Sequence, residues 1–191
     1  MSSHIDKAPV IAGAESWSHV GNKRVGALCI HGFTGNPSSM RGVAEAFAGA
    51  GYDVELPRLP GHGTAVSDMI PSRWSDWTFE VAAAYTRLAA RVDKVVVAGL
   101  SMGGSLTLWT ALQQPTVSGI VCINPASQPQ AEEMIEMVKG MLAEGTEVFP
   151  GIGSDIADPE VKESSYPETP LAPLVSMVED GIKPMLAQYG S

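Results

Sequence analysis

The 191-residue sequence has few residues that bind metals or form disulfides. Its two cysteines, Cys29 and Cys122, lie in apolar stretches that are typical of strands, at a separation that matches no metal or redox motif. We therefore expect both to be buried, reduced thiols. The four histidines are scattered without metal-ligand spacing. The sequence thus predicts neither a metal site nor a cofactor.

Basic residues and long apolar runs are also scarce. Twelve Lys and Arg residues stand against 21 Asp and Glu, which gives a net charge of −9 and a pI of about 4.8. This balance argues against nucleic acid and anionic membrane surfaces as partners. No eighteen consecutive residues are apolar, and the N-terminus lacks the basic start and apolar stretch of a signal peptide. We expect a cytoplasmic protein without a membrane span.

The acidic excess is confined to one part of the chain. Residues 1–126 carry nine acidic and nine basic side chains, whereas residues 127–191 carry twelve acidic and three basic. This division predicts two structural regions, the second with an acidic, solvated surface. With 45% hydrophobic residues, the chain is long enough to bury one substantial core.

The most informative stretch is 95–112. Its apolar, β-branched start ends in Gly99-Leu100-Ser101-Met102-Gly103, and helical apolar spacing follows. The Gly-x-Ser-x-Gly pattern between a strand and a helix is typical of a tight turn that exposes a nucleophilic serine. A phosphate-binding loop is the main alternative, but Ser105 stands where that loop needs its lysine. We therefore interpret Ser101 as a nucleophile.

Strand and helix patterns alternate along the first two thirds of the chain. Alternation with connections of this length predicts an α/β fold with a mostly parallel sheet and helices on both faces. The carboxyl ends of such strands form the active crevice, where Phe33, His62 and Ser101 all fall. The expected strands are 16–20 and 24–30 (a hairpin turning at Gly21-Asn22), 52–56, 95–98 and 119–124; the expected helices are 38–50, 75–91 and 102–113.

The pattern changes after Pro125, where no further apolar strand is expected. Ser127 and Gln130 resemble a capping box that opens a helix. One face of that helix carries Met134, Met137, Val138, Met141 and Leu142. We expect these residues to pack against the core, and also to form a substrate wall if the helix covers the crevice. Residues 149–173 are expected to form loops, and 174–188 one or two short helices interrupted at Gly181 and Pro184.

Several segments together resemble a known family. Ile30-His31-Gly32-Phe33-Thr34-Gly35, Leu59-Pro60-Gly61-His62-Gly63, the paired Trp74 and Trp77, and the Ser101 turn are similar to the α/β-hydrolase superfamily, and more narrowly to its bacterial carboxylesterase and monoacylglycerol lipase branch. The similarity covers about residues 15–126. It implies that 1–126 is the N-terminal part of the hydrolase core and that 127–191 is a small helical cap.

The resemblance assigns roles to individual residues. It makes Ser101 the nucleophile and places the oxyanion hole at the backbone N–H groups of Phe33 and Met102. The Phe33 side chain would border the acyl pocket, with Met134, Met137 and Met141 as further substrate contacts. His31 and His62 would be structural. No cofactor is implied, and the implied partner is a small acyl ester.

The expected catalytic base is missing from these residues. The family orders its triad as Ser, then Asp or Glu, then His, yet all four histidines precede Ser101. Asp155, Asp158 and Asp180 follow the serine but lie in the cap-like stretch, so none is assigned the orienting role. Two further family strands, which carry the acid and the histidine, have no counterpart here. Three interpretations stay open: a fragment completed by a separate C-terminal piece, a truncated gene, or His31 acting as an unusual base.

Two functions follow from these observations. The first is a serine carboxylic ester hydrolase that acts on short to medium acyl esters or monoacylglycerols through an acyl-enzyme on Ser101. Thioesterase, lactonase and carbon–carbon bond hydrolase activities use the same arrangement. The second is a non-catalytic, hydrolase-like binding or assembly protein, which the lack of a histidine after Ser101 favours. Without its base, the chain alone is expected to be nearly inactive and to expose the apolar edge of the strand at 119–124.

Overall fold

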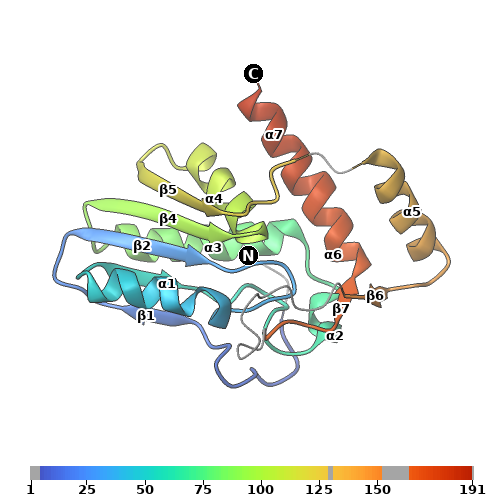
Figure 1. Cartoon of the computed structure of the whole chain (residues 1–191), viewed down its shortest axis with the longest axis horizontal. Coiled ribbons are helices and arrows are strands. Elements are labelled where there is room, and N and C mark those ends of the chain that lie inside the picture. The colour runs from blue at the N-terminus through green and yellow to red at the C-terminus, as the bar shows by residue number, and fades with distance from the viewer. Residues whose placement is uncertain (1–4, 129–130, 152–163, 191) are drawn as a thin grey trace.

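A five-stranded sheet forms the centre of the computed structural model, which describes residues 5–128, 131–151 and 164–190 (Figure 1). Its order is β1-β3-β2-β4-β5, and β3, β2, β4 and β5 run parallel. The strands are β1 (Trp17–His19), β2 (Val25–Ile30), β3 (Asp53–Leu56), β4 (Lys94–Leu100) and β5 (Val117–Ile123). The expected mostly parallel α/β sheet is confirmed.

The expected hairpin between 16–20 and 24–30 is wrong. β1 pairs antiparallel with β3 and makes no ladder with β2. The Gly21 N–H donates to Asp53 Oδ1 at 2.9 Å, and the next two N–H groups donate to the Gly51 carbonyl. The turn is therefore held against the start of β3, and β2 lies on the far side of that strand.

Helices cover both faces of the sheet, as the alternation predicts. α1 (Ser38–Gly49) packs on one face, and α3 (Trp74–Ala89) and α4 (Met102–Gln113) pack on the other, while α2 (Val66–Met69) is a short helix before α3 (Figure 1). Alternate side chains of β2 explain the arrangement. Leu28 and Ile30 join the core that contains α3, whereas Cys29 joins the core beneath α1.

The region after β5 differs from the expectation at two points. α5 (Glu132–Ala143) begins five residues after the expected cap at Ser127, and Gln130 lies outside the described residues. Two short strands, β6 (Val148–Pro150) and β7 (Glu168–Pro170), form an antiparallel pair within the stretch expected to be loops. Asp155 and Asp158, to which the sequence assigned no orienting role, lie outside the described residues.

The last described helical segments follow one another without a break. α6 (Leu171–Ser176), a π-helical turn η1 (Met177–Ile182) and α7 (Lys183–Tyr189) succeed each other directly, so the interruptions expected at Gly181 and Pro184 are wrong. A Cβ at Gly181 would lie 2.4 Å from the Trp74 ring, so this glycine lets the helix approach α3 closely. Pro184 follows the π-helical turn, where the hydrogen-bond register already changes.

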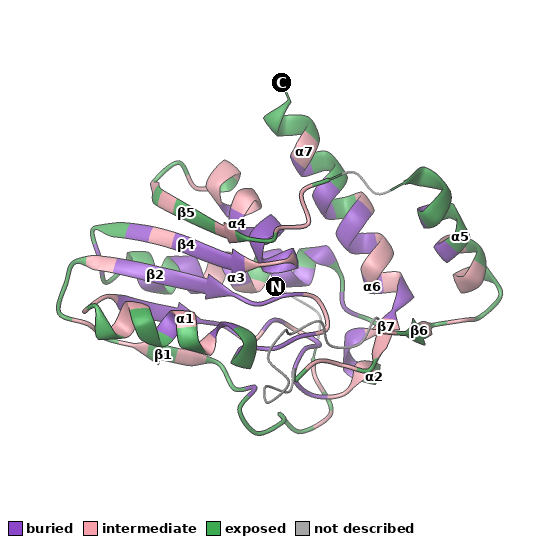
Figure 2. Cartoon of the chain, in the orientation of Figure 1, coloured by how far each residue is buried: buried purple, intermediate pink, exposed green. Residues whose placement is uncertain are grey.

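The segments after β5 share one core with the sheet. Ile135 of α5 and Met177, Val178 and Ile182 of η1 belong to the same buried cluster as Trp74. β5, by contrast, is the edge of the described sheet, and its outer face is exposed (Figure 2). Ile120 and Val121 are each 43% exposed. The apolar edge expected from the sequence is thus confirmed.

Candidate active site

Ser101 occupies the sharp turn between β4 and α4. Its backbone angles, φ 54° and ψ −118°, lie in a region that a non-glycine residue adopts at a cost of about 1–3 kcal/mol. The side chain is half-buried, and its hydroxyl forms no hydrogen bond with a described residue. The main chain holds the turn, because the Ser101 N–H donates to the Ile123 carbonyl at 2.9 Å and the Gly104 N–H donates to the Ser101 carbonyl at 2.8 Å.

Two glycines permit this turn. A Cβ at Gly99 would lie 2.0 Å from the Gly103 carbonyl oxygen, and one at Gly103 would lie 2.1 Å from the Ile30 carbonyl oxygen. Both distances are far shorter than a carbon–oxygen contact allows. The first turn of α4 therefore lies directly against the ends of β4 and β2, and a side chain at either glycine would force them apart.

The loop after β2 lies beside the serine. β2 and β4 pair in parallel register, with Ile30 opposite Gly99, so the residues that follow them emerge together at the carboxyl edge of the sheet. A Cβ at Gly32 would lie 3.9 Å from Ser101 Oγ. The next amide is that of Phe33. No hydrogen bond joins the Phe33 or Met102 N–H group to a described residue.

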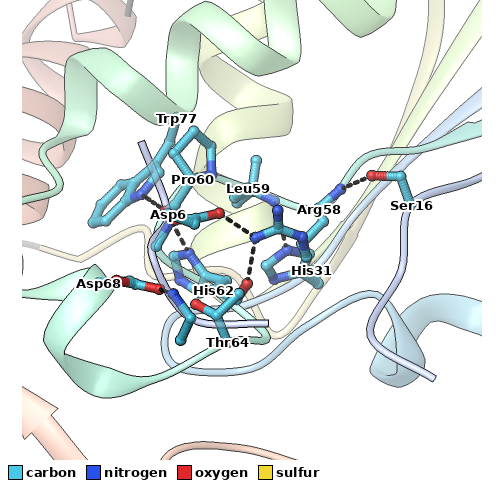
Figure 3. Close-up of polar contacts among 12 residues, drawn as sticks. Asp6, Ser16, His31, Arg58, Leu59, Pro60, His62, Thr64, Asp68 and Trp77 are labelled. Atoms are coloured by element: carbon cyan, nitrogen blue, oxygen red, sulfur yellow. Dashed lines mark hydrogen bonds and ion pairs between the residues drawn. The ribbon is translucent and has the colours of Figure 1, made fainter. Parts of the chain in front are cut away.

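His31 directly follows β2, and its ring lies beside Leu59 (Figure 3). The Leu59 N–H donates to Nε2 at 3.1 Å, so the proton is on Nδ1, which donates to the Gly32 carbonyl at 3.0 Å. The ring is fully buried, and burial holds its pKa well below 6.5. These contacts contradict the interpretation of His31 as an unusual base and give it a structural role.

His62 is the second buried histidine of this cluster. Its Nδ1 donates to the Pro60 carbonyl at 3.0 Å, while Nε2 has no partner among the described residues. Burial is the main cause that lowers its pKa to about 4. Its ring packs edge-on against His31 at 5.0 Å and Trp77 at 5.6 Å between centroids. His62 is therefore a neutral packing residue.

The N-terminal segment holds the loop that carries His62. Arg58 pairs with Asp6 and donates from Nη1 to the His62 carbonyl at 2.8 Å (Figure 3). The Gly61 N–H donates to Asp6 Oδ1 at 2.8 Å, and the Ala8 N–H donates to a carboxylate oxygen of α2 at 2.9 Å. The N-terminal segment thus fixes the position of the loop at 58–64.

The methionines of α5 lie differently from the expectation. Ile135 and Val138 are buried, whereas Met134 is 36% and Met137 60% exposed. The packing role expected for these two methionines is therefore wrong, because the buried positions are those that directly follow them in the sequence. Figure 1 shows α5 on the side of α6 away from the sheet. A substrate contact by Met134, Met137 or Met141 stays a prediction.

Sequence reasoning missed two segments that lie around the site. The stretch after β5 is held against the first turn of α4, because Ser105 Oγ donates to the Ala126 carbonyl at 2.8 Å. The segment before β7 reaches the loop of Phe33, because the Tyr166 N–H donates to the Thr34 carbonyl at 3.0 Å. Asn124-Pro125 after an apolar strand could have signalled the first. Nothing local in the sequence signals the second.

The described residues offer no evident place for a metal. Within them, no three His, Cys, Asp or Glu side chains gather as ligands. A cavity of about 290 Å³ lies between Arg73, α5 and α6, and neither Ser101 nor the loop of Phe33 lines it. No helix in the described ranges is both long and apolar enough to span a bilayer.

A strained serine turn at the carboxyl edge of a parallel sheet, beside a glycine loop, defines the class of α/β hydrolases that use a serine nucleophile. The chain belongs to the α/β hydrolase fold family, whose model matches residues 28–150, and within it to the carboxylesterase and lipase branch. The resemblance found in the sequence is confirmed.

Two curated relatives support this assignment. The chain is 44% identical over 174 residues to a thermostable monoacylglycerol lipase of Bacillus sp. (strain H-257), which covers 90% of this chain and 67% of the relative. It is 29% identical over 160 residues to a carboxylesterase of Bacillus subtilis (strain 168), covering 82% and 62%. The chain thus spans about two thirds of the length of these relatives.

Solved structures agree with the fold. One, from a study of the metagenome-derived lipolytic enzymes LipS and LipT, shares 42% identity at a TM-score of 0.86 and covers 94% of this chain and 72% of that chain. The structure of Paleococcus ferrophilus monoacylglycerol lipase matches at a TM-score of 0.66 with 17% identity, over 89% and 70% of the two chains, which shows the shared fold alone.

Proposed function

We propose that the chain is the nucleophile-bearing part of a serine carboxylic ester hydrolase that acts on short to medium acyl esters, monoacylglycerols among them. The observation that carries the proposal is the backbone of Ser101, held at φ 54° beside Gly32. The curated relatives named monoacylglycerol lipase and carboxylesterase support the substrate class.

The reaction begins at the Ser101 hydroxyl. As its oxygen attacks the ester carbonyl, its proton passes to a base and the carbonyl oxygen gains negative charge. The N–H groups of Phe33 and Met102 would donate to that oxygen. When the tetrahedral intermediate collapses, the alcohol leaves with the proton, and water then releases the acid from the acyl-enzyme. Losing one such donor typically lowers the rate by about 10² to 10³.

We propose that the base and its orienting acid come from polypeptide outside these 191 residues, either contiguous or separate. All four histidines precede Ser101 in the sequence, and the two at the site, His31 and His62, are buried and neutral. Asp180 lies on η1, where its Oδ2 accepts a hydrogen bond from Ser176 at 2.6 Å, and we assign it no orienting role.

The division of the chain follows from the same proposal. Residues 1–126 would form the hydrolase core, and residues 127–191 would form a cap whose methionines Met134, Met137 and Met141 contact the acyl chain. The Phe33 ring, which lies edge-on to Trp77 at 5.9 Å, would border the acyl pocket. Both cysteines are free thiols, Cys29 buried as expected and Cys122 only partly buried, and we propose a cytoplasmic location on this basis.

The test compares two forms of the protein. The first is the 191-residue chain, and the second continues it with the part of the Bacillus monoacylglycerol lipase that follows its matched region. Both are treated with a fluorophosphonate and assayed on p-nitrophenyl butyrate and a monoacylglycerol. The completed form should turn over the esters and carry the adduct on Ser101, whereas the chain alone keeps at most a residual 10³ to 10⁴ over water.

Ser101→Ala is the control, and it should abolish both labelling and turnover. A completed form that folds, as judged by circular dichroism, yet neither labels nor hydrolyses any ester would favour the second candidate function. That candidate is a non-catalytic binding protein, which the relatives named as a lipase and a carboxylesterase do not favour.

A further inference from the structure

The loop that carries the Phe33 amide contains a strained residue. Thr34 has φ 60°, in the left-handed region that a β-branched side chain rarely adopts. Its own hydroxyl donates to the Phe33 carbonyl at 2.6 Å, which ties its side chain to the adjacent peptide. A backbone in such a region persists only where its surroundings hold it there. The contacts of Thr34 therefore hold the peptide between Phe33 and Thr34, which directly follows the Phe33 amide.

The segment 164–166, which leads into β7, supplies those contacts. The Tyr166 N–H donates to the Thr34 carbonyl at 3.0 Å. Two residues further along the same loop, Asn36 donates from Nδ2 to the Ser164 carbonyl and to Ser164 Oγ. Asn36 is only 2% exposed, so these donors have little access to water. Residues 164–166 thus hold the loop of Phe33, and we call their contacts with Thr34 and Asn36 the clamp.

The Tyr166 side chain fixes the clamp to a second loop. Its hydroxyl donates to the Gly61 carbonyl at 2.8 Å and accepts from the Thr64 N–H at 2.9 Å. The loop at 61–64 is itself held by the N-terminal segment. On its other side the clamp continues into the small sheet of β6 and β7, where the Gly151 N–H donates to the Pro167 carbonyl at 2.9 Å.

We propose that Tyr166 and Asn36 are positioning residues that hold Thr34 in its strained conformation, so that the Phe33 amide points at the reacting oxygen only while the segment 164–166 is seated. A displacement of the segment 164–166, which belongs to the proposed cap, would therefore also displace the Phe33 amide. The inference rests on the proposed function for its catalytic meaning, but the clamp itself can be measured on the 191-residue chain without any activity.

The deciding experiment is hydrogen–deuterium exchange on the 191-residue chain. Tyr166→Phe removes the hydroxyl bonds to Gly61 and Thr64 and keeps the ring. Asn36→Asp keeps the oxygen that accepts from the Ser38 N–H at 3.0 Å and removes both donors to Ser164. Each should speed exchange of the peptide 31–37 by about tenfold or more. Exchange in the peptides of β2 and β4 should stay unchanged.

Tyr85→Phe is the matched control. It removes another tyrosine hydroxyl bond, the 2.8 Å contact with Thr116, far from the loop in sequence and on α3. It should lower overall stability in urea by a similar amount without speeding exchange at 31–37. If Tyr166→Phe changes that peptide no more than Tyr85→Phe does, the clamp is refuted.

A second background tests the strain directly. Glycine adopts φ 60° freely, so Thr34→Gly removes the need for the clamp. In that background Tyr166→Phe should change the exchange of 31–37 by less than about twofold. In the completed enzyme, Tyr166→Phe should lower kcat about tenfold or more and leave KM within about twofold, because the Phe33 amide acts on the charged intermediate. An inactive completed enzyme would refute the function and leave the exchange result to judge the clamp.

Discussion

Acid should destabilise the protein through His62. The ring is fully buried and neutral, and its pKa of about 4 in the folded chain lies below the ordinary 6.5. Between these values the unfolded chain binds a proton that the folded chain does not, so stability is complete above pH 6.5 and falls as the pH falls toward 4. At pH 4 the loss from this residue is about 3 kcal/mol, at 1.36 kcal/mol per pH unit.

Urea unfolding at pH 7, 5.5 and 4 measures this effect, with tryptophan fluorescence as the signal because Trp77 packs on His62. Carboxylates and His31 also titrate, so the comparison is with His62→Asn, whose amide can still donate to the Pro60 carbonyl. The variant should be less stable at pH 7, and the gap to the wild type should shrink by about 3 kcal/mol at pH 4. A gap that stays constant would refute the reasoning.

Three further predictions concern stability and association. Gly99→Ala should prevent folding or cost several kcal/mol, since its Cβ would lie 2.0 Å from a carbonyl oxygen, whereas Gly42→Ala in α1, with no atom within 4 Å, should raise the melting temperature slightly. Arg91→Leu should cost about 2–3 kcal/mol in urea unfolding, because it leaves two buried carboxylates of β3 without this partner. We expect the open apolar edge at β5 to promote self-association, so Ile120→Lys should reduce it in sedimentation experiments. Phe79→Lys on α3, where Phe79 is 47% exposed, should not.

The parts of the fold that the sequence predicted are those fixed by neighbours along the chain. The apolar run before Ser101 and the helical spacing after it determine β4, the turn and α4 locally, since each glycine of the motif is required by a contact within a few residues or with the adjacent strand. The alternation of strands and helices likewise determines the layer order, because a parallel sheet needs a crossover between neighbouring strands.

The parts that the sequence did not predict depend on contacts between distant residues. A Gly-Asn pair between two strands favours a hairpin, but Asp53, more than thirty residues later, draws Gly21 to β3 instead. The helix expected after Ser127 begins only at Glu132, and the Ser127 N–H donates instead to the Pro125 carbonyl at 2.9 Å. Tyr166 stands in a stretch without periodicity, and only the folded chain brings it to Thr34.

The pairing of β2 with β4 has a consequence for how this protein tolerates change. The spacing between the serine turn and the Phe33 loop is set by main-chain hydrogen bonds of two adjacent strands, with Ile30 opposite Gly99. Replacing exposed side chains on the surrounding helices, away from the first turn of α4, leaves that spacing unchanged, so the sequence can vary at those positions. Inserting or deleting a single residue in either strand would turn each later side chain of that strand to the opposite face of the sheet. It would also shift Ser101 relative to the Phe33 loop.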